Sequence, residues 1–226
     1  MSDRSRWRST LLLAAAAAAG AVAAIAVDRV VFDDGDPSAG AGDVTLTPDD
    51  LGAGWALDAT LTLGGDGDAG MLNGCALALG VPADVQGAFT SLSDSSGDII
   101  TSEVRVTSSA SEAAELFEGA TALETTECIR AGLEADAIGR YAPATPVAAF
   151  VEPLETTPWA EQSRAYRIRV DVTGQPLEWL DVHVLRGDRA IAVVQVLDQA
   201  ERIASEVPVN AVRAVLDGLT ATFDRR

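Results

Sequence analysis

Hydrophobic and polar residues alternate along the last third of the chain in a pattern that predicts a three-stranded antiparallel meander. Runs of alternating Val, Ile and Leu occur within residues 165–172, 177–185 and 189–197, such as Ile168-Val170-Val172 and Leu180-Val182-Val184. This is the period of a strand with one buried face. Gly174-Gln175 and Gly187-Asp188 separate the three runs and suit two-residue turns that begin with Gly.

The same alternation in residues 99–106 predicts a further strand with one exposed face. A capping box formed by Ser109 and Glu112 then opens a helix. We expect this central helix to continue toward Leu133, with Gly119 as its weak point. A C-terminal helix is predicted beyond Pro208. The apolar positions at helical spacing are Ala113, Leu116, Phe117, Ala120 and Leu123 in the first, and Val212, Val215, Leu216, Leu219 and Phe223 in the second.

Together these elements predict the fold class. Helices that bracket an antiparallel sheet are typical of an α+β domain. We therefore expect an antiparallel sheet that includes the C-terminal meander, packed by a central and a C-terminal helix. Thr47 and Pro48 have the residue types of an N-cap and a first helical position, so a short helical turn is expected there.

The N-terminus carries an export signal. Residues 1–10 form a basic region with Arg4, Arg6 and Arg8, and residues 11–27 contain no charged or strongly polar side chain. As a helix this stretch would span about 26 Å, close to the hydrocarbon thickness of a bilayer. Arginines before it and aspartates after it place the N-terminus in the cytoplasm and the following domain outside.

Two fates of the apolar stretch remain open. Ala24-Ile25-Ala26 fits the small-residue pattern of a signal-peptide cleavage site, whereas the stretch is longer than a usual signal-peptide core. An uncleaved anchor predicts a single-pass protein of the cell membrane, and cleavage predicts a secreted one. Residues 28–44 are rich in Gly, Asp, Pro and Ser and predict a flexible acidic linker. Residues 45–226 then form the extracytoplasmic α+β domain.

The net charge of the chain excludes one class of partner. The formal net charge is −18, and all 16 basic residues are Arg. Binding to nucleic acid or to anionic lipid headgroups requires clustered basic residues, so we expect no nucleic acid partner. The membrane is expected to be contacted only through residues 11–27, if they are retained.

The chain has two cysteines, Cys75 and Cys128. Outside the cytoplasm an even number of thiols is expected to pair, which predicts one disulfide. A catalytic thiol would need a histidine, and the lone His183 lies in a predicted strand with no signature residues nearby. A zinc site needs four ligands, which two distant cysteines and one histidine do not supply. We predict no metal, no cofactor and no catalytic cysteine.

One sheet face is a candidate ligand surface. If both turns have two residues as predicted, Tyr166 lies opposite His183 and Ile168 opposite Asp181. Tyr166, Trp179, Asp181 and His183 then share one face with small apolar residues. This mixture is typical of the wall of a ligand cleft. It is equally typical of a partly exposed sheet face, and a register shift of one residue would separate the four side chains.

The order of these features resembles the extracytoplasmic sensor domains attached to some mycobacterial Ser/Thr kinases (the PknH type) and their free-standing actinobacterial versions. The segments that carry the resemblance are "LTPDDLGAGW", "SEVRVTSSASEAAELFEGA" followed by "EC", "AYRIRV", "LDVHVLRGDRAIAVVQV" and "NAVRAVLDGL". It implies an α+β domain, a Cys75–Cys128 disulfide and an unidentified extracellular ligand in a cleft. The chain lacks the second cysteine pair of the kinase-linked type and a kinase domain, so direct phosphorelay is not implied.

Three functions are compatible with these features. The first is a non-enzymatic, membrane-tethered or secreted sensor-like domain that binds a small molecule or a cell-envelope component. The second is an envelope protein–protein interaction module, which predicts an exposed apolar patch. The third is a hydrolase with an unrecognised site. No G-x-S-x-G, P-loop, G-x-G-x-x-G or H-E-x-x-H motif is present.

Overall fold

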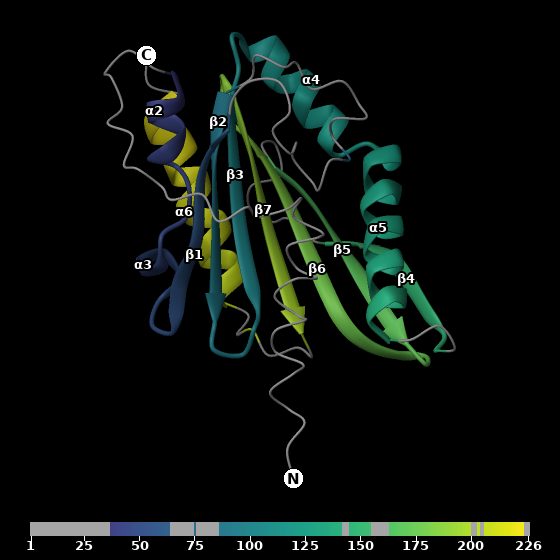
Figure 1. The fold of residues 1–226 in the computed structure, drawn as a ribbon. Coiled ribbons are helices and arrows are strands. Elements are labelled where there is room, and N and C mark those ends of the chain that lie inside the picture. The colour runs from purple at the N-terminus through teal and green to yellow at the C-terminus, as the bar shows by residue number, and fades with distance from the viewer. Residues whose placement is uncertain are drawn as a thin grey trace.

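The protein is an α+β domain built on one antiparallel sheet, as the sequence predicts (Figure 1). The structure is a computed structural model that describes residues 37–63, 75, 86–141, 145–154, 163–199, 203 and 206–223. The strand order is β1-β2-β3-β7-β6-β5-β4. The strands are β1 (Trp55–Leu63), β2 (Gln86–Asp94), β3 (Ile99–Val106), β4 (Val147–Pro153), β5 (Ser163–Val172), β6 (Gln175–Arg186) and β7 (Ala190–Gln199).

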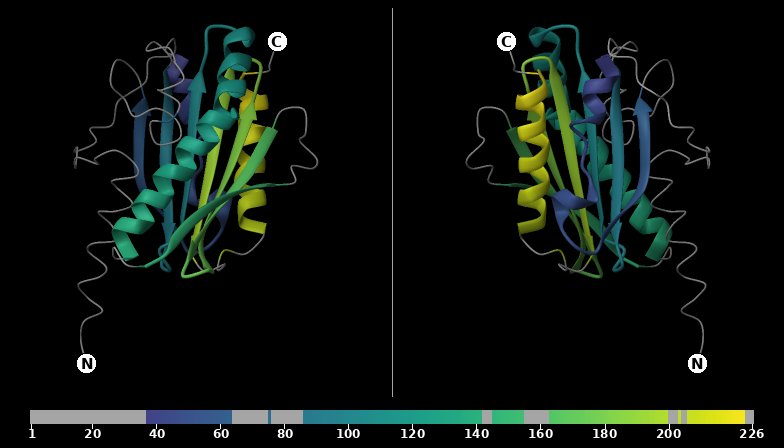
Figure 2. Two further views of the ribbon diagram at one scale, coloured as in Figure 1. Left: turned by 90° about the vertical axis from the view of Figure 1, so that its right-hand side faces the viewer. Right: turned by 90° about the vertical axis from the view of Figure 1, so that its left-hand side faces the viewer.

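Helices cover both faces of this sheet (Figure 2). On one face α6 (Glu206–Phe223) packs on β7 and β6, together with α2 (Pro37–Gly42) and α3 (Pro48–Leu51). On the other face α4 (Ala110–Ala120) packs on β6 and β7, and α5 (Leu123–Tyr141) packs on β4 and β5. We call the two faces the α6 side and the α5 side.

Each side has its own hydrophobic core. The central strand β7 contributes to both, with Ala192 and Val194 on the α6 side and Ile191 and Val193 on the α5 side. β3 is also buried on both faces over most of its length, so the expected exposed face is wrong. The reason is its place next to β7, where helices cover the sheet on both sides.

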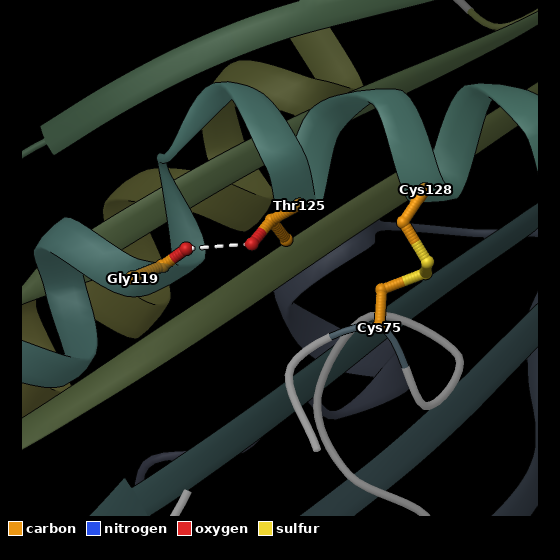
Figure 3. Close-up of a disulfide and its surroundings, with 4 residues drawn as sticks. All are labelled: Cys75, Gly119, Thr125 and Cys128. Atoms are coloured by element: carbon orange, nitrogen blue, oxygen red, sulfur yellow. Dashed lines mark hydrogen bonds between the residues drawn. A yellow bond between two sulfur atoms is a disulfide. The ribbon is translucent and has the colours of Figure 1, made fainter. Parts of the chain in front are cut away.

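The predicted central helix is two helices. Ser109 caps the first by accepting a hydrogen bond from the backbone N–H of Glu112. This helix, α4, ends at Ala120, next to the predicted weak point Gly119. The hydroxyl of Thr125, in the first turn of α5, donates to the carbonyl oxygen of Gly119 over 2.7 Å (Figure 3). The Gly119 carbonyl, which has no partner within α4, accepts this bond in addition to one from the backbone N–H of Ala122.

Three strands were not predicted from the sequence. β1 and β2 lie before the first predicted strand, and β4 lies in a proline-containing stretch. The described fold also begins at Pro37, inside residues 28–44, whose composition predicts a linker. Ala41 and Val44 are buried in the α6-side core, which explains why this segment folds onto the sheet. The predicted export segment, residues 1–27, lies outside the described residues.

The register of the meander differs from the prediction at both turns. The first hairpin turns at Thr173-Gly174, because Val172 pairs with Gln175. This shift alone changes the pairing by two residues and preserves the faces. A β-bulge between Val170 and Asp171 then adds one residue in β6. The β5 residues that precede the bulge, Tyr166 among them, therefore lie on the opposite face to the one predicted relative to β6.

The second turn also shifts, but the faces are preserved. The backbone N–H of Gly187 donates to the carbonyl oxygen of Ala190 over 2.8 Å, so the turn residues are Asp188-Arg189. His183 consequently pairs with Val194 and not with Ala192. The change is again two residues, so His183 keeps its predicted face on β6.

The backbone geometry of the first turn leads to a prediction about the stability of the protein. Thr173 and Gly174 both have positive φ angles, 56° and 78°, as a type I′ turn requires. A β-branched residue is strained there, whereas Asn adopts this conformation readily. We expect Thr173→Asn to raise the free energy of unfolding by about 1 kcal/mol, measured by urea denaturation. Thr173→Ser, which removes only the branch, should gain less; no gain in either variant would contradict the strain.

Candidate functional site

The predicted ligand residues do not all lie together. Trp179, Asp181 and His183 alternate along β6 and point to the α6 side. Tyr166 pairs with Val182 and lies in the α5-side core. The bulge in the first hairpin is the physical reason for this correction. The predicted four-residue face is therefore wrong in one member, and three members share a side.

Trp179, Asp181 and His183 lie at the border of a part of the α6 side with little helical cover. α6 packs on β7 and β6, whereas α5, the described helix that packs on β4 and β5, lies on the opposite side. Figure 1 shows α5 in front of β4 and β5, with α6 behind the other half of the sheet. We call this surface the open face. Its side chains are Phe150, Glu152, Arg167, Arg169, Asp171, Trp179, Asp181 and His183.

Ion pairs between neighbouring strands organise the open face. Arg167 binds Asp181 with two hydrogen bonds, Nε to Oδ1 over 2.6 Å and Nη2 to Oδ2 over 2.8 Å. Arg169 binds Glu152 over 2.5 Å and Asp171 over 2.9 Å. The open face therefore presents arginines whose planar groups are fixed by carboxylates.

An aromatic ring completes this surface. The guanidinium of Arg169 lies 5.2 Å from the centre of the Phe150 ring, within the range of a cation–π contact. Phe150 is 44% exposed on the edge strand β4. A surface that combines an exposed ring with oriented hydrogen-bonding groups can bind a ligand that has both apolar and polar parts.

His183 is half-buried, and its neighbours on the same side of β6, Trp179 and Asp181, are buried with 7% and 8% of their surface exposed. Within the described part of the chain, its Nε2 atom is buried and has no hydrogen-bond partner. Burial lowers the pKa of His183 below its usual value of 6.5, and Arg167 lowers it further, while Asp181 raises it. The imidazole is therefore neutral at neutral pH. Among the described residues, no hydroxyl or thiol is therefore hydrogen-bonded to Nε2 as a nucleophile would be.

Tyr166 has a structural environment. It packs with Ile168 and Val170 in the α5-side core. Burial raises the pKa of the Tyr166 hydroxyl, and the neighbouring hydroxyl of Thr126 opposes this effect. The phenol thus remains protonated and contributes to the packing of α5 on β5.

A buried ion pair fastens the C-terminal end of α5 to β6. The Arg140 guanidinium donates to both carboxylate oxygens of Glu178, with 2.7 Å between Nη2 and Oε2. The hydroxyl of Tyr141 donates to the same carboxylate over 3.2 Å. Burial and the nearby Glu178 raise the pKa of Tyr141 to about 12, so it remains a donor. This group lies on the α5 side and is not part of the open face.

The two cysteines form the predicted disulfide (Figure 3). Cys75 and Cys128 have their Cα atoms 5.8 Å apart and are separated by 53 residues in sequence. Both Cys75 and the first half of α5 belong to the α5-side core. The bond therefore supports the layer that covers β4 to β6 from behind the open face.

The open face was only partly visible in the sequence. The alternation in "RIRVDV" places Arg167, Arg169 and Asp171 on one face of β5, so this signal was present. Phe150 and Glu152 could not be assigned, because β4 itself was not predicted.

Metal-binding and membrane-spanning features are absent from the described residues. No three or more His, Cys, Asp and Glu side chains gather there in a way that could hold a metal ion. No helix in the described ranges has the length and apolar character needed to cross a bilayer. The exposed large apolar residues are distributed over several elements: Leu57 and Leu61 on β1, Leu123 and Ile138 on α5, Phe150 and Val151 on β4, and Val209 on α6.

Solved structures that are similar to this chain include the extracellular domain of PknH from Mycobacterium tuberculosis, the type of domain that the sequence resembles. That likeness has a TM-score of 0.48 and 8% sequence identity, over 81% of this chain and 96% of that one. A putative uncharacterized protein (Rv0999 ortholog) from Mycobacterium smegmatis has a TM-score of 0.38 and 14% identity, over 74% and 92%. No protein-family model and no curated protein matches the chain.

Proposed function

We propose that this protein is a non-enzymatic extracytoplasmic domain that binds a small molecule or a cell-envelope component through its open face. Residues 11–27 tether it to the membrane or direct its secretion. The disulfide supports this compartment, because such bonds persist outside the reducing cytoplasm. The chain's negative net charge argues against nucleic acid as the ligand.

The observation that carries the proposal is the contrast between the two halves of the α6 side. Over β7 and β3, this side is packed with apolar residues beneath α6 and α2. Over β4 and β5 it instead presents Arg167 and Arg169, held by carboxylates, beside the exposed ring of Phe150. Oriented polar groups around an exposed ring are expected of a recognition surface, and a surface with only a packing role does not require them.

Binding can be tested at Phe150. The probes are purified cell-wall polysaccharide and vesicles of envelope lipids, both from the organism that encodes the chain. We expect one of them to bind the wild-type protein and Phe150→Ser to weaken that binding about tenfold, which corresponds to about 1.4 kcal/mol. Co-sedimentation at a series of protein concentrations measures the affinity.

The matched control is Ile138→Ser on α5. Ile138 is 47% exposed, close to the 44% of Phe150, but it lies on the opposite side of the sheet. It should leave the affinity unchanged, and thermal unfolding verifies that both variants are folded. The proposal fails if neither probe binds, or if the two variants weaken binding equally.

A further inference from the structure

His183 is the only histidine of the chain and lies beside an ion pair at the edge of the open face. The residue that pairs with it on β5 is Ala165, whose side chain has no polar group. Arg167, two residues further along β5, is held by Asp181. The imidazole, the carboxylate and the guanidinium therefore form a row on one side of two paired strands.

Asp181 is within reach of both cations. It lies directly opposite Arg167 and two residues before His183 on the same side of β6. Two residues of a strand advance by roughly 6.6 Å. This separation between the Cβ atoms can be spanned by an Asp and a His side chain joined by a hydrogen bond. A rotation of the Asp181 side chain is therefore sufficient to change its partner.

Among the residues that the structure describes, the other surroundings of His183 offer no alternative acceptor. The electrostatic influences on the imidazole come from Asp181 and Arg167. β7 contributes the apolar residues Val194 and Val196 on this side. α6 turns apolar residues toward the sheet, while its charged residues are exposed. The buried α6 residues are Ala211, Val212, Val215, Leu216 and Leu219, and the exposed charged ones are Glu206, Arg213 and Asp217.

We propose that this row is a proton-binding switch: when the imidazole of His183 takes up a proton, Asp181 exchanges Arg167 for His183. The switch releases Arg167 from Asp181 and changes the charge pattern of the open face. Its ligand is the proton, so the inference does not depend on the proposed recognition of an envelope component.

Burial decides the direction of the exchange. The side chain of Arg167 is 33% exposed, so water can solvate its guanidinium after release. The Nε2 atom of His183 is buried, so an imidazolium there would be costly without a carboxylate. The Asp181 carboxylate therefore stabilises a buried His183 imidazolium more than it stabilises the partly exposed Arg167 guanidinium.

The pH range of the switch follows from the pKa of His183 in the folded state and in the unfolded state. Burial lowers the pKa of His183 in the folded state below the ordinary value of 6.5. Between these two values the unfolded chain binds more protons than the folded one. The domain therefore loses stability as the pH falls below 6.5, and the loss levels off below the folded-state pKa. The exchange belongs to the same acidic range.

The test is an NMR titration of the full chain from pH 7.5 to 4.5. It follows the His183 ring nitrogens and the Nε–H of Arg167. We expect this Nε–H to lose its protection from solvent exchange in the same step in which His183 takes up its proton. An Arg167 signal that stays protected through the His183 step would overturn the proposal, and this measurement needs no variant.

Asp181→Asn provides the second measurement. If Asp181 becomes the partner of the imidazolium, its loss should lower the pKa of His183 by roughly one unit or more. Asp171→Asn is the matched control, since it removes the same charge from the open face but Asp171 binds Arg169. It should leave the His183 titration unchanged. Equal pKa values for His183 in wild type and Asp181→Asn would refute the exchange.

Discussion

We expect the Arg140→Met variant to lose about 3–5 kcal/mol of unfolding free energy, because it leaves the carboxylate of Glu178 buried without its cation. The Glu178 side chain is 4% exposed, and both of its oxygens accept hydrogen bonds from Arg140. Tyr141 supplies one further hydrogen bond, which cannot replace the lost charge. Urea denaturation at pH 7 measures the effect.

Two variants separate this effect from a general loss of side-chain packing. Arg130→Met changes an arginine on the same helix whose ion pairs with Glu127 and Glu134 are solvated, and it should cost no more than about 1 kcal/mol. Adding Glu178→Gln to Arg140→Met should recover part of the stability, because an amide is less costly to bury than an unpaired charge. Equal losses for Arg140→Met and Arg130→Met would show that the buried pair is unimportant.

Removing the disulfide should have a comparable effect. Cys75 and Cys128 close a loop of 53 residues, and the chain-entropy model assigns such a closure roughly 4 kcal/mol of stabilisation. We expect the double variant Cys75→Ala/Cys128→Ala to lose about 2–4 kcal/mol in urea denaturation. Thiol titration of the native exported protein should find no free thiol.

Reductant provides the control for this prediction. Dithiothreitol should destabilise the wild-type protein and leave the double alanine variant unchanged, since that variant has no disulfide to reduce. A wild-type protein that is equally stable with and without reductant would contradict a structural role for the bond. Two free thiols in the native protein would contradict the bond itself.

The sequence predicted the elements that have strong periodicity and a clear covering layer. The meander β5 to β7 and the helix α6 bury one well-defined set of apolar residues, so their alternation is visible in the sequence. β1 and β4 are edge strands with exposed apolar residues such as Leu57 and Phe150, and their pattern is correspondingly weak. Proline-containing stretches on either side also conceal β4, although an edge strand tolerates proline.

The same limit of prediction from sequence applies to the individual residues of the candidate site. Trp179, Asp181 and His183 share a side because they alternate within one strand, which the sequence determines directly. The position of Tyr166 depends on the pairing of two strands, and one bulge beside Asp171 was sufficient to move it. Arg167 became part of the site for the same reason. Residue alternation is thus a local property, whereas register is not.

The strand order also has a consequence for how the domain folds. β7, the last strand to be synthesised, lies in the middle of the sheet between β3 and β6. Before it is in place, β1 to β3 and β4 to β6 can form only two separate hairpin sheets with unprotected edges. The decisive contacts, such as Val104 with Ala192, join distant parts of the chain, so we expect slow folding. The two halves become one cooperative unit only when the final strand inserts between them.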